Sequence, residues 1–215
     1  MTRAEQRFLR EMKRPFEQTC RTAGKERGWK TVSGIHYQVR DGILYELFPD
    51  LPPVDRGTAV SAWLCCKPVE LDEMLWRVFH MEEETAGKPF SFHINGAFTA
   101  PELTLSRWKT PLPEPEALRE AVEAVFVQAE TLIAENRFST LASFRQAVER
   151  ERANSRRTLG VILCMLCEGN YRTAAEEISQ ALARGEDGGF LRLSGGSILE
   201  DARDWCARRL AEAET

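Results

Sequence analysis

A cluster of prolines near the middle of the chain separates two stretches with different sequence periodicity. Pro111, Pro113 and Pro115 lie close together, and such a run is typical of a boundary between structural parts. Before this cluster, short runs rich in β-branched and aromatic residues predict strands. After it, apolar residues recur every three or four positions, which predicts helices. Strands and helices segregated along the chain favour an α+β protein over a parallel α/β fold.

We therefore expect an α+β sheet domain over residues 1–110 and a helical region over residues 111–215. The sheet domain should hold an antiparallel sheet of four to six strands with flanking helices, and Pro15 should kink or divide the first helix. The expected strands cover residues 29–32, 35–40, 43–48, 58–66, 90–94, 97–99 and 103–108. The expected helices cover residues 2–24, 68–81, 116–137, 138–154, 158–167, 171–184 and 197–212.

The sharpest local signal is the Asp41-Gly42 dipeptide between two β-prone runs. A two-residue hairpin turn of type I′ needs positive φ at both central positions, and Asp-Gly meets that need with little strain. A second local signal stands near the end of the chain, where Ser197 and Glu200 have the spacing of a helix capping box. We expect a β-hairpin at the first site and a helix start at the second.

Composition excludes several classes of protein. The 215 residues carry a formal net charge of −4 and are 43% hydrophobic, which is ordinary for a globular protein. No apolar run is long enough for a membrane helix, and the charged N-terminal residues do not form a signal peptide. The six cysteines lie in apolar surroundings without an export signal, which predicts a cytoplasmic protein with reduced thiols. Both signs of charge are interspersed, so we expect neither a membrane nor a nucleic acid as partner.

A stretch over residues 158–184 resembles a tetratricopeptide repeat in its second half. The residues that carry this resemblance are Gly169, Tyr171, Ala174, Ile178, Ala181 and Leu182. The first half departs from the pattern, because Ile162 stands where a small residue is expected. One such helical hairpin is too little for a superhelical groove, which usually takes about three repeats. The resemblance therefore implies a helical hairpin, a unit that often serves protein–protein contacts.

The N-terminal half resembles a bacterial family of domains of unknown function, number 4304. The resemblance lies in an amphipathic first helix, the entry into a strand at Trp29-Lys30, the Asp41-Gly42 hairpin and Pro68 after an apolar strand. The resemblance implies a bacterial protein with an α+β domain. The family has no agreed activity, so the resemblance adds little about chemistry.

Three residues with catalytic side chains fall on predicted strands. His36 and Arg40 alternate with the apolar positions of one strand, and His93 alternates with Phe92 and Ile94 on another. If both strands belong to one sheet, His36, Arg40 and His93 could line a polar face as acid, base and anion-binding groups. No nucleophile motif such as GxSxG accompanies them. The catalytic residues are therefore unknown, with these three as candidates.

Metal and cofactor sites have weaker support. Cys164 and Cys167 have CxxC spacing, but they lie in an apolar helical run and lack a second pair of ligands, so we interpret them as core residues. His80 and Glu84 offer too few ligands for a metal. The glycine-rich segment 185–196 lacks the spacing of a phosphate-binding loop. We expect no cofactor and no metal, with Cys164 and Cys167 as the only metal candidates.

These observations favour a non-catalytic protein-interaction or accessory module with an unidentified protein partner. An immunity-protein-like role would suit the size, acidity and α+β layout, because an acidic surface can attract a basic partner. The alternative is a small enzyme that uses the polar sheet face with His36, Arg40 and His93. An enzyme should show a pocket where these groups converge, whereas a binding protein should show an exposed apolar or charged patch.

Overall fold

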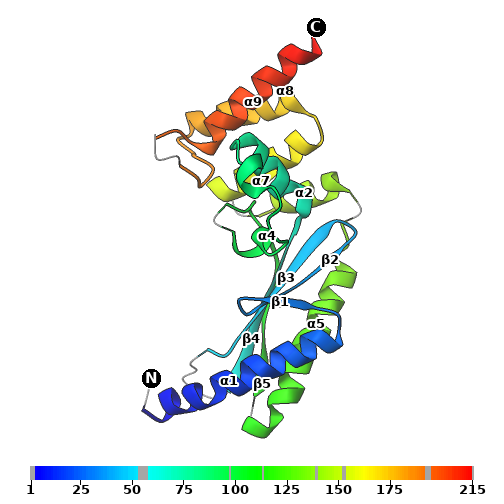
Figure 1. The fold of residues 1–215 in the computed structure, drawn as a ribbon, viewed down its shortest axis with the longest axis vertical. Helices are drawn as coiled ribbons and strands as arrows, with labels where there is room; N and C mark the ends of the chain where they lie inside the picture. The colour runs from blue at the N-terminus through cyan, green and yellow to red at the C-terminus, as the bar shows by residue number, and fades with distance from the viewer. Residues whose placement is uncertain are drawn as a thin grey trace. The chain divides into compact units, whose positions relative to one another are not determined.

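The computed structural model describes residues 3–52, 58–96, 98–112, 114–138, 140–151, 154–191 and 195–214 (Figure 1). The strands are β1 (Lys30–Val32), β2 (Ile35–Arg40), β3 (Ile43–Asp50), β4 (Thr58–Pro68) and β5 (Leu103–Leu112). The helices are α1 (Arg3–Glu26), α2 (Val69–Val78), α3 (Glu82–Thr85), α4 (Phe92–Asn95), η1 (Pro115–Ala117), α5 (Leu118–Glu135), α6 (Leu141–Glu149), α7 (Ser155–Cys167), α8 (Tyr171–Ala183) and α9 (Ile198–Ala213).

The five strands form one antiparallel sheet in the order β1-β2-β3-β4-β5, which confirms the predicted α+β class. The hairpin predicted at Asp41-Gly42 joins β2 to β3, and both turn residues have positive φ, 52° and 77°. In the β2–β3 ladder His36 pairs with Leu47 and Arg40 pairs with Ile43. Strands that follow one another along the chain are thus neighbours in the sheet, although α2, α3 and α4 lie between β4 and β5.

The contacts divide the chain into two compact units that interleave along the sequence. Unit 1 comprises residues 1–66 and 104–137, and unit 2 comprises residues 67–103 and 138–215. The predicted boundary between 1–110 and 111–215 does not coincide with this division. Pro111 lies inside β5, and α5 belongs to unit 1 although it follows the proline cluster. Pro113 lies outside the described residues.

Unit 1 buries its core between the sheet and the pair α1 and α5. These helices pack on each other, and α1 also contacts β1 while α5 contacts β3. The buried stripe of α5 includes Val122, Phe126 and Ile133. This apolar stripe needs the sheet and α1 as its cover, which explains why α5 belongs to the strand-rich unit. Pro15 does not divide α1, which is one helix through this position.

Unit 2 is built around α7. Residues 158–166 of this helix are all buried, and α7 packs against α2, α6 and α8. α8 packs in turn on α9, and the two lie side by side in Figure 1. The turn between α7 and α8 passes through Gly169 at φ 73°, and Ala174 and Ala181 are fully buried. The helical hairpin predicted for residues 158–184 is therefore present.

Two local predictions have different outcomes, one at the start of α9 and one at residues 90–94. Ser197 and Glu200 form the predicted capping box at the start of α9. The strand predicted for residues 90–94 is wrong, because this segment forms the short helix α4. Its amides bond to nearby carbonyls, with Ile94 N–H donating to the Ser91 oxygen at 3.0 Å, instead of to a neighbouring strand. The strand predicted for residues 97–99 is also wrong, because Phe98 and Thr99 belong to no strand, while Ala97 lies outside the described residues.

Candidate functional site

The predicted polar sheet face does not form. His93 lies in α4 rather than on a strand, and it belongs to unit 2, whereas His36 and Arg40 belong to unit 1. Arg40 is exposed near the Asp41-Gly42 turn, where its Nε donates a hydrogen bond to Gln38 at 3.0 Å. Within unit 1, His36 stands at the opposite end of β2 and is buried. The geometric basis for joint catalysis by His36, Arg40 and His93 is therefore missing.

His36 points into the core instead of away from it. Its ring packs edge-on against Phe126 with centroids 5.1 Å apart, and its Nδ1 is hydrogen-bonded to Thr31 Oγ1 at 3.1 Å. A Cβ at Gly24 would come within 2.8 Å of that Nδ1, so the glycine of α1 makes room for the imidazole. The apolar positions of β2 face the other way, and Val39 is 44% exposed. Burial, with the charge of Arg21, lowers the pKa of His36 to about 4.

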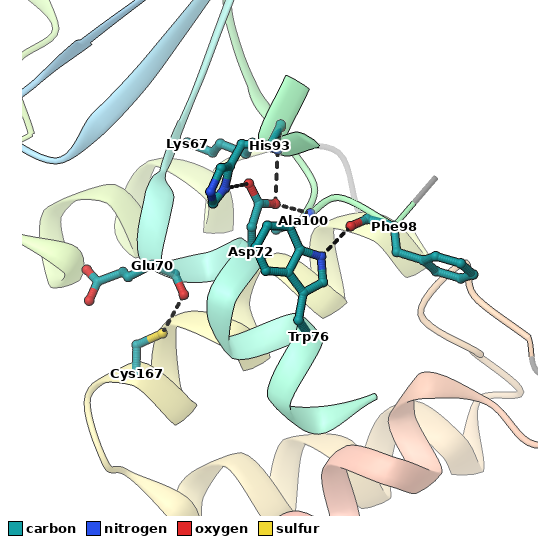
Figure 2. A network of polar contacts seen from close by, with 8 residues as sticks. All are labelled: Lys67, Glu70, Asp72, Trp76, His93, Phe98, Ala100 and Cys167. Carbon is teal, nitrogen blue, oxygen red and sulfur yellow. Dashed lines mark hydrogen bonds and ion pairs between the residues drawn. The ribbon is translucent and has the colours of Figure 1, made fainter. Parts of the chain in front are cut away.

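His93 joins a buried polar network centred on Asp72 of α2 (Figure 2). Asp72 Oδ2 bonds to His93 Nδ1 at 2.9 Å, and Oδ1 accepts hydrogen bonds from Lys67 Nζ at 3.0 Å and from the Ala100 amide at 2.6 Å. Lys67 Nζ also donates to the main-chain oxygen of His93 at 2.8 Å. The side chains of Lys67 and Asp72 are fully buried, and that of His93 is 13% exposed.

This network ties a long connection to the helical core of unit 2. The segment between α3 and β5 contains His93 and Ala100, and both are held by the single carboxylate of Asp72. Trp76, one turn further along α2, adds a hydrogen bond from its Nε1 to the Phe98 oxygen at 2.7 Å. A buried charge pair is tolerated when further hydrogen bonds surround it, and here Lys67 Nζ and both carboxylate oxygens of Asp72 each bond to a group outside the pair. We name these five residues, Lys67, Asp72, Trp76, His93 and Ala100, the Asp72 network.

Sequence reasoning missed the Asp72 network. In the sequence, Asp72 is an acidic residue near the start of the helix expected over residues 68–81, where the helix dipole favours it. The available signal was Lys67, a charge at the end of the apolar strand 58–66 and beside the helix that begins at Val69. A lysine in such a position needs a partner, and the sequence alone does not identify which of the neighbouring acids supplies it.

The segment held by the Asp72 network carries three phenylalanines, and two more come from the end of α2 and from the connection between α8 and α9. These five residues, all at least partly exposed, are Phe79, Phe90, Phe92, Phe98 and Phe190, and we name them the aromatic surface. Phe79, Phe98 and Phe190 form a triangle with ring centroids 5.6, 5.8 and 6.2 Å apart. Trp76 packs on Phe92 and on His93 with ring centroids 5.5 and 4.7 Å apart, and its Nε1 bonds to the main-chain oxygen of Phe98.

Part of the aromatic surface is open to solvent. Phe90 is 37% exposed, and Leu191, which follows Phe190, is 64% exposed. Phe90 also packs on the His93 ring at 4.8 Å, so its position depends on the Asp72 network. Aromatic side chains give much contact area for little loss of conformational entropy, which makes them frequent anchors in protein interfaces.

The CxxC pair does not have the setting of a redox or metal site. Cys164 is buried and Cys167 is half-buried, with its Sγ donating to the Glu70 oxygen at 3.7 Å. Burial raises the pKa of Cys164 above its usual range and that of Cys167 to about 12. Over the described ranges of the chain, no group of three or more His, Cys, Asp or Glu side chains could hold a metal ion.

Raised thiol pKa values should make Cys167 slow to react in the folded protein. A thiol whose pKa rises from 9 to about 12 has about 1,000-fold less thiolate at pH 8, and the thiolate is the reactive form. We expect iodoacetamide to modify Cys167 at least about 100-fold more slowly in the native protein than in urea. Peptide mass spectrometry over time measures the rate, with Cys167→Ser to identify the signal. Equal rates in both states would contradict the expectation.

The remaining candidates show no assembled site. Cys65 and Cys66 are both buried in β4. His80 is exposed at a positive φ of 56° after α2, where it ends the helix. Burial also raises the pKa of Cys20 to about 12 and that of Cys206 to about 11, so these thiols are protonated at neutral pH.

Comparison with known proteins adds no relative. None of the helices in the described part of the chain combines the length and apolar character needed to cross a bilayer. No protein family matches the sequence, and no curated protein or solved structure shows significant similarity to it.

Proposed function

We propose that the protein is a non-catalytic interaction module that binds a protein partner through the aromatic surface. The observation that carries this proposal is the group of partly exposed phenylalanines, Phe79, Phe90, Phe92, Phe98 and Phe190, which three separate chain segments supply. Folded monomers seldom expose contiguous apolar patches unless these patches bind something. A partner would bury these rings and gain the hydrophobic free energy that they now forgo.

The Asp72 network supports the same proposal. An interface built on a loop needs that loop held in place before the partner arrives, because ordering it on binding would weaken affinity. Asp72 holds both ends of the segment from His93 to Ala100 through hydrogen bonds of 2.9 and 2.6 Å. The polar network therefore preorganises the phenylalanines without contributing an exposed group of its own beyond part of the His93 ring.

The enzyme alternative has less support. It depended on His36, Arg40 and His93 converging on one face, and they come from different units and from opposite ends of β2. The imidazole of His93 is committed to Asp72, and that of His36 is buried against Phe126. Each histidine thus has a structural role that the packing explains.

Photo-crosslinking tests the proposal in the cells that naturally express the protein. We expect p-benzoylphenylalanine at position 90 to give one discrete protein adduct, which excess unmodified protein suppresses. The matched control is the same substitution at Phe138, a partly exposed phenylalanine of unit 2 that packs on Phe144 outside the aromatic surface. No adduct at position 90, or the same adduct at both positions, would overturn the proposal.

Once the adduct is identified, surface variants measure the contribution of the rings. Phe90→Ser with Phe190→Ser should weaken binding to that partner at least about tenfold, since central aromatic residues carry most of an interface's free energy. The control is Val39→Ser with Val127→Ser. These two apolar residues of unit 1 are exposed to a similar extent as each other, 44% and 48%. Circular dichroism checks that both variants fold. Equal loss of affinity in both would point to a non-specific effect.

A further inference from the structure

Unit 1 contains a groove of about 720 Å3, and no residue of the aromatic surface lines it. One wall is α1, the second is the turn between β1 and β2, and the third is the end of β3 with Trp63 of β4. Binding sites for small molecules typically measure about 300–1,000 Å3, so the groove has the volume of a ligand site. All of its lining residues belong to unit 1.

An aromatic platform forms part of this groove. The rings of Phe48 and Trp63 are stacked, with centroids 5.0 Å apart and planes 6° from parallel. Both side chains are half-buried and both line the groove. A stacked pair of this kind holds its rings in a fixed plane, which suits the flat face of a third ring.

Charged residues of both signs surround the platform. Lys13, Glu17 and Arg21 follow one another at four-residue spacing on α1, so they share one face of the helix, and Asp50 lies at the end of β3. All four are exposed. Among the ion pairs found in the described residues, none involves any of these four side chains. Among the described residues that line it, the groove therefore has two exposed cations and two exposed carboxylates.

The buried residues that line the groove carry no charge at neutral pH. His36 lies there with its Nδ1 bonded to the Thr31 hydroxyl, and burial keeps its pKa near 4. Phe16 and Cys20, both buried, complete the floor from the α1 side. The charges available to a ligand are thus those of the rim, and they balance.

We propose that this groove binds a small zwitterionic ligand that carries an aromatic ring, of the class of short peptides with free ends. The ring stacks on the Phe48–Trp63 platform. The carboxylate pairs with Lys13 or Arg21, and the ammonium group pairs with Glu17 or Asp50. A ligand with only one sign of charge would leave two charges of the rim unpaired, and an uncharged aromatic ligand would leave all four, so a zwitterion fits best. This site is independent of the aromatic surface in unit 2.

Isothermal titration calorimetry with the tripeptide Gly-Phe-Gly tests the proposal on the full chain. We expect the free-ended peptide to bind at least tenfold more tightly than its N-acetylated, C-amidated form, which keeps the ring and loses both charges. Trp63→Ala should weaken binding of the free-ended peptide at least tenfold. Trp205→Ala, a substitution of a partly exposed tryptophan on α9 of unit 2, is the matched control and should leave binding unchanged.

Charge variants then assign each end of the ligand. At least one of Asp50→Asn and Glu17→Gln should weaken binding of Gly-Phe-Gly severalfold and leave binding of its N-acetylated form unchanged, because that form has no ammonium group. At least one of Arg21→Gln and Lys13→Gln should do the same for the carboxylate, judged with the C-amidated form. All four side chains are exposed, so these variants should fold even if Trp63→Ala does not.

Three results would overturn the assignment. Equal binding of the free-ended and capped peptides would show that the rim charges play no part. No heat of binding for the free-ended peptide at millimolar concentration would remove the site. Equally tight binding of a capped peptide with aspartate and lysine side chains around the phenylalanine would assign the groove to a segment of a protein instead. None of these results bears on the aromatic surface, because the crosslinking at Phe90 is measured separately.

Discussion

Replacing Asp72 by alanine should destabilise unit 2 by about 3–5 kcal/mol, the range seen when one partner of a buried ion pair is removed. The variant would leave the fully buried ammonium group of Lys67 without its carboxylate. It would also remove the acceptor of the Ala100 amide and of His93 Nδ1. The loss should appear as a lower midpoint of urea unfolding, followed by circular dichroism, and as faster hydrogen exchange at the Ala100 amide.

Two further variants separate the effect of the unpaired Lys67 charge from the other effects of losing Asp72. Glu73→Ala is the matched control, because Glu73 is the next acidic residue of α2, half-exposed and 3.9 Å from Arg77. Its effect should stay within about 0.5 kcal/mol, as for other exposed pairs. The double variant Lys67→Met with Asp72→Leu removes both charges and should be more stable than Asp72→Ala alone. If Asp72→Ala loses no more stability than Glu73→Ala, the network does not hold the segment.

The same substitution connects stability to the proposed function. Because Asp72 holds the segment that carries Phe92 and Phe98, its loss should disorder part of the aromatic surface. Under conditions in which the Asp72→Ala variant remains folded, the crosslink from position 90 should therefore still be weaker than in the protein with Asp72. Phe90 packs on the ring of His93, which is bonded to Asp72, so the effect would pass through His93.

Lowering the pH from 7 to 4 should destabilise unit 1 by about 3 kcal/mol through His36 alone. The pKa of His36 is about 4 in the folded protein and about 6.5 in an unfolded chain. Between these values the unfolded state binds more protons, so stability falls as the pH falls. The stability that neutral His36 contributes is fully present above pH 6.5 and is lost as the pH falls to about 4. A shift of about 2.5 pH units at about 1.4 kcal/mol each amounts to about 3.5 kcal/mol, of which about 3 kcal/mol is lost by pH 4, because His36 of the folded protein is half protonated there.

The variant His36→Asn isolates this contribution from the titration of carboxylates. Asparagine does not titrate and can place a polar atom near the position of Nδ1, within reach of the Thr31 hydroxyl. Urea unfolding at several pH values between 4 and 7 should give a steeper loss of stability for the wild type than for His36→Asn. Parallel curves would show that His36 titrates normally and is not buried against Phe126 in solution.

Local sequence signals predicted local structure well. Asp41-Gly42 predicted a hairpin because a two-residue turn with positive φ depends almost entirely on the residues within it, and both residues have that conformation. Ser197 and Glu200 predicted a capping box because both hydrogen bonds close within one turn of helix. The helical hairpin over residues 158–184 followed from apolar spacing and from a turn glycine at position 169.

Predictions that depended on distant contacts were less successful. The alternation along β2 identified two faces correctly, but only the packing of α5 and the gap at Gly24 decided that the His36 face is the buried one. The five residues 90–94 alternate as a strand would, and a run this short does not distinguish a strand from a turn of helix. Without a neighbouring strand to bond, the segment satisfied its amides locally.

The sequence by itself determined the α+β class, the hairpin at Asp41-Gly42 and the helix start at Ser197, since each depends on hydrogen bonds or periodicity within a few residues. Only the tertiary structure decided that α5 belongs with the strands and that Lys67 and His93 share the carboxylate of Asp72. It also decided that the rings of Phe79, Phe98 and Phe190 pack together. These outcomes depend on which apolar and charged groups must leave water together, and that is decided by contacts between residues far apart in the chain.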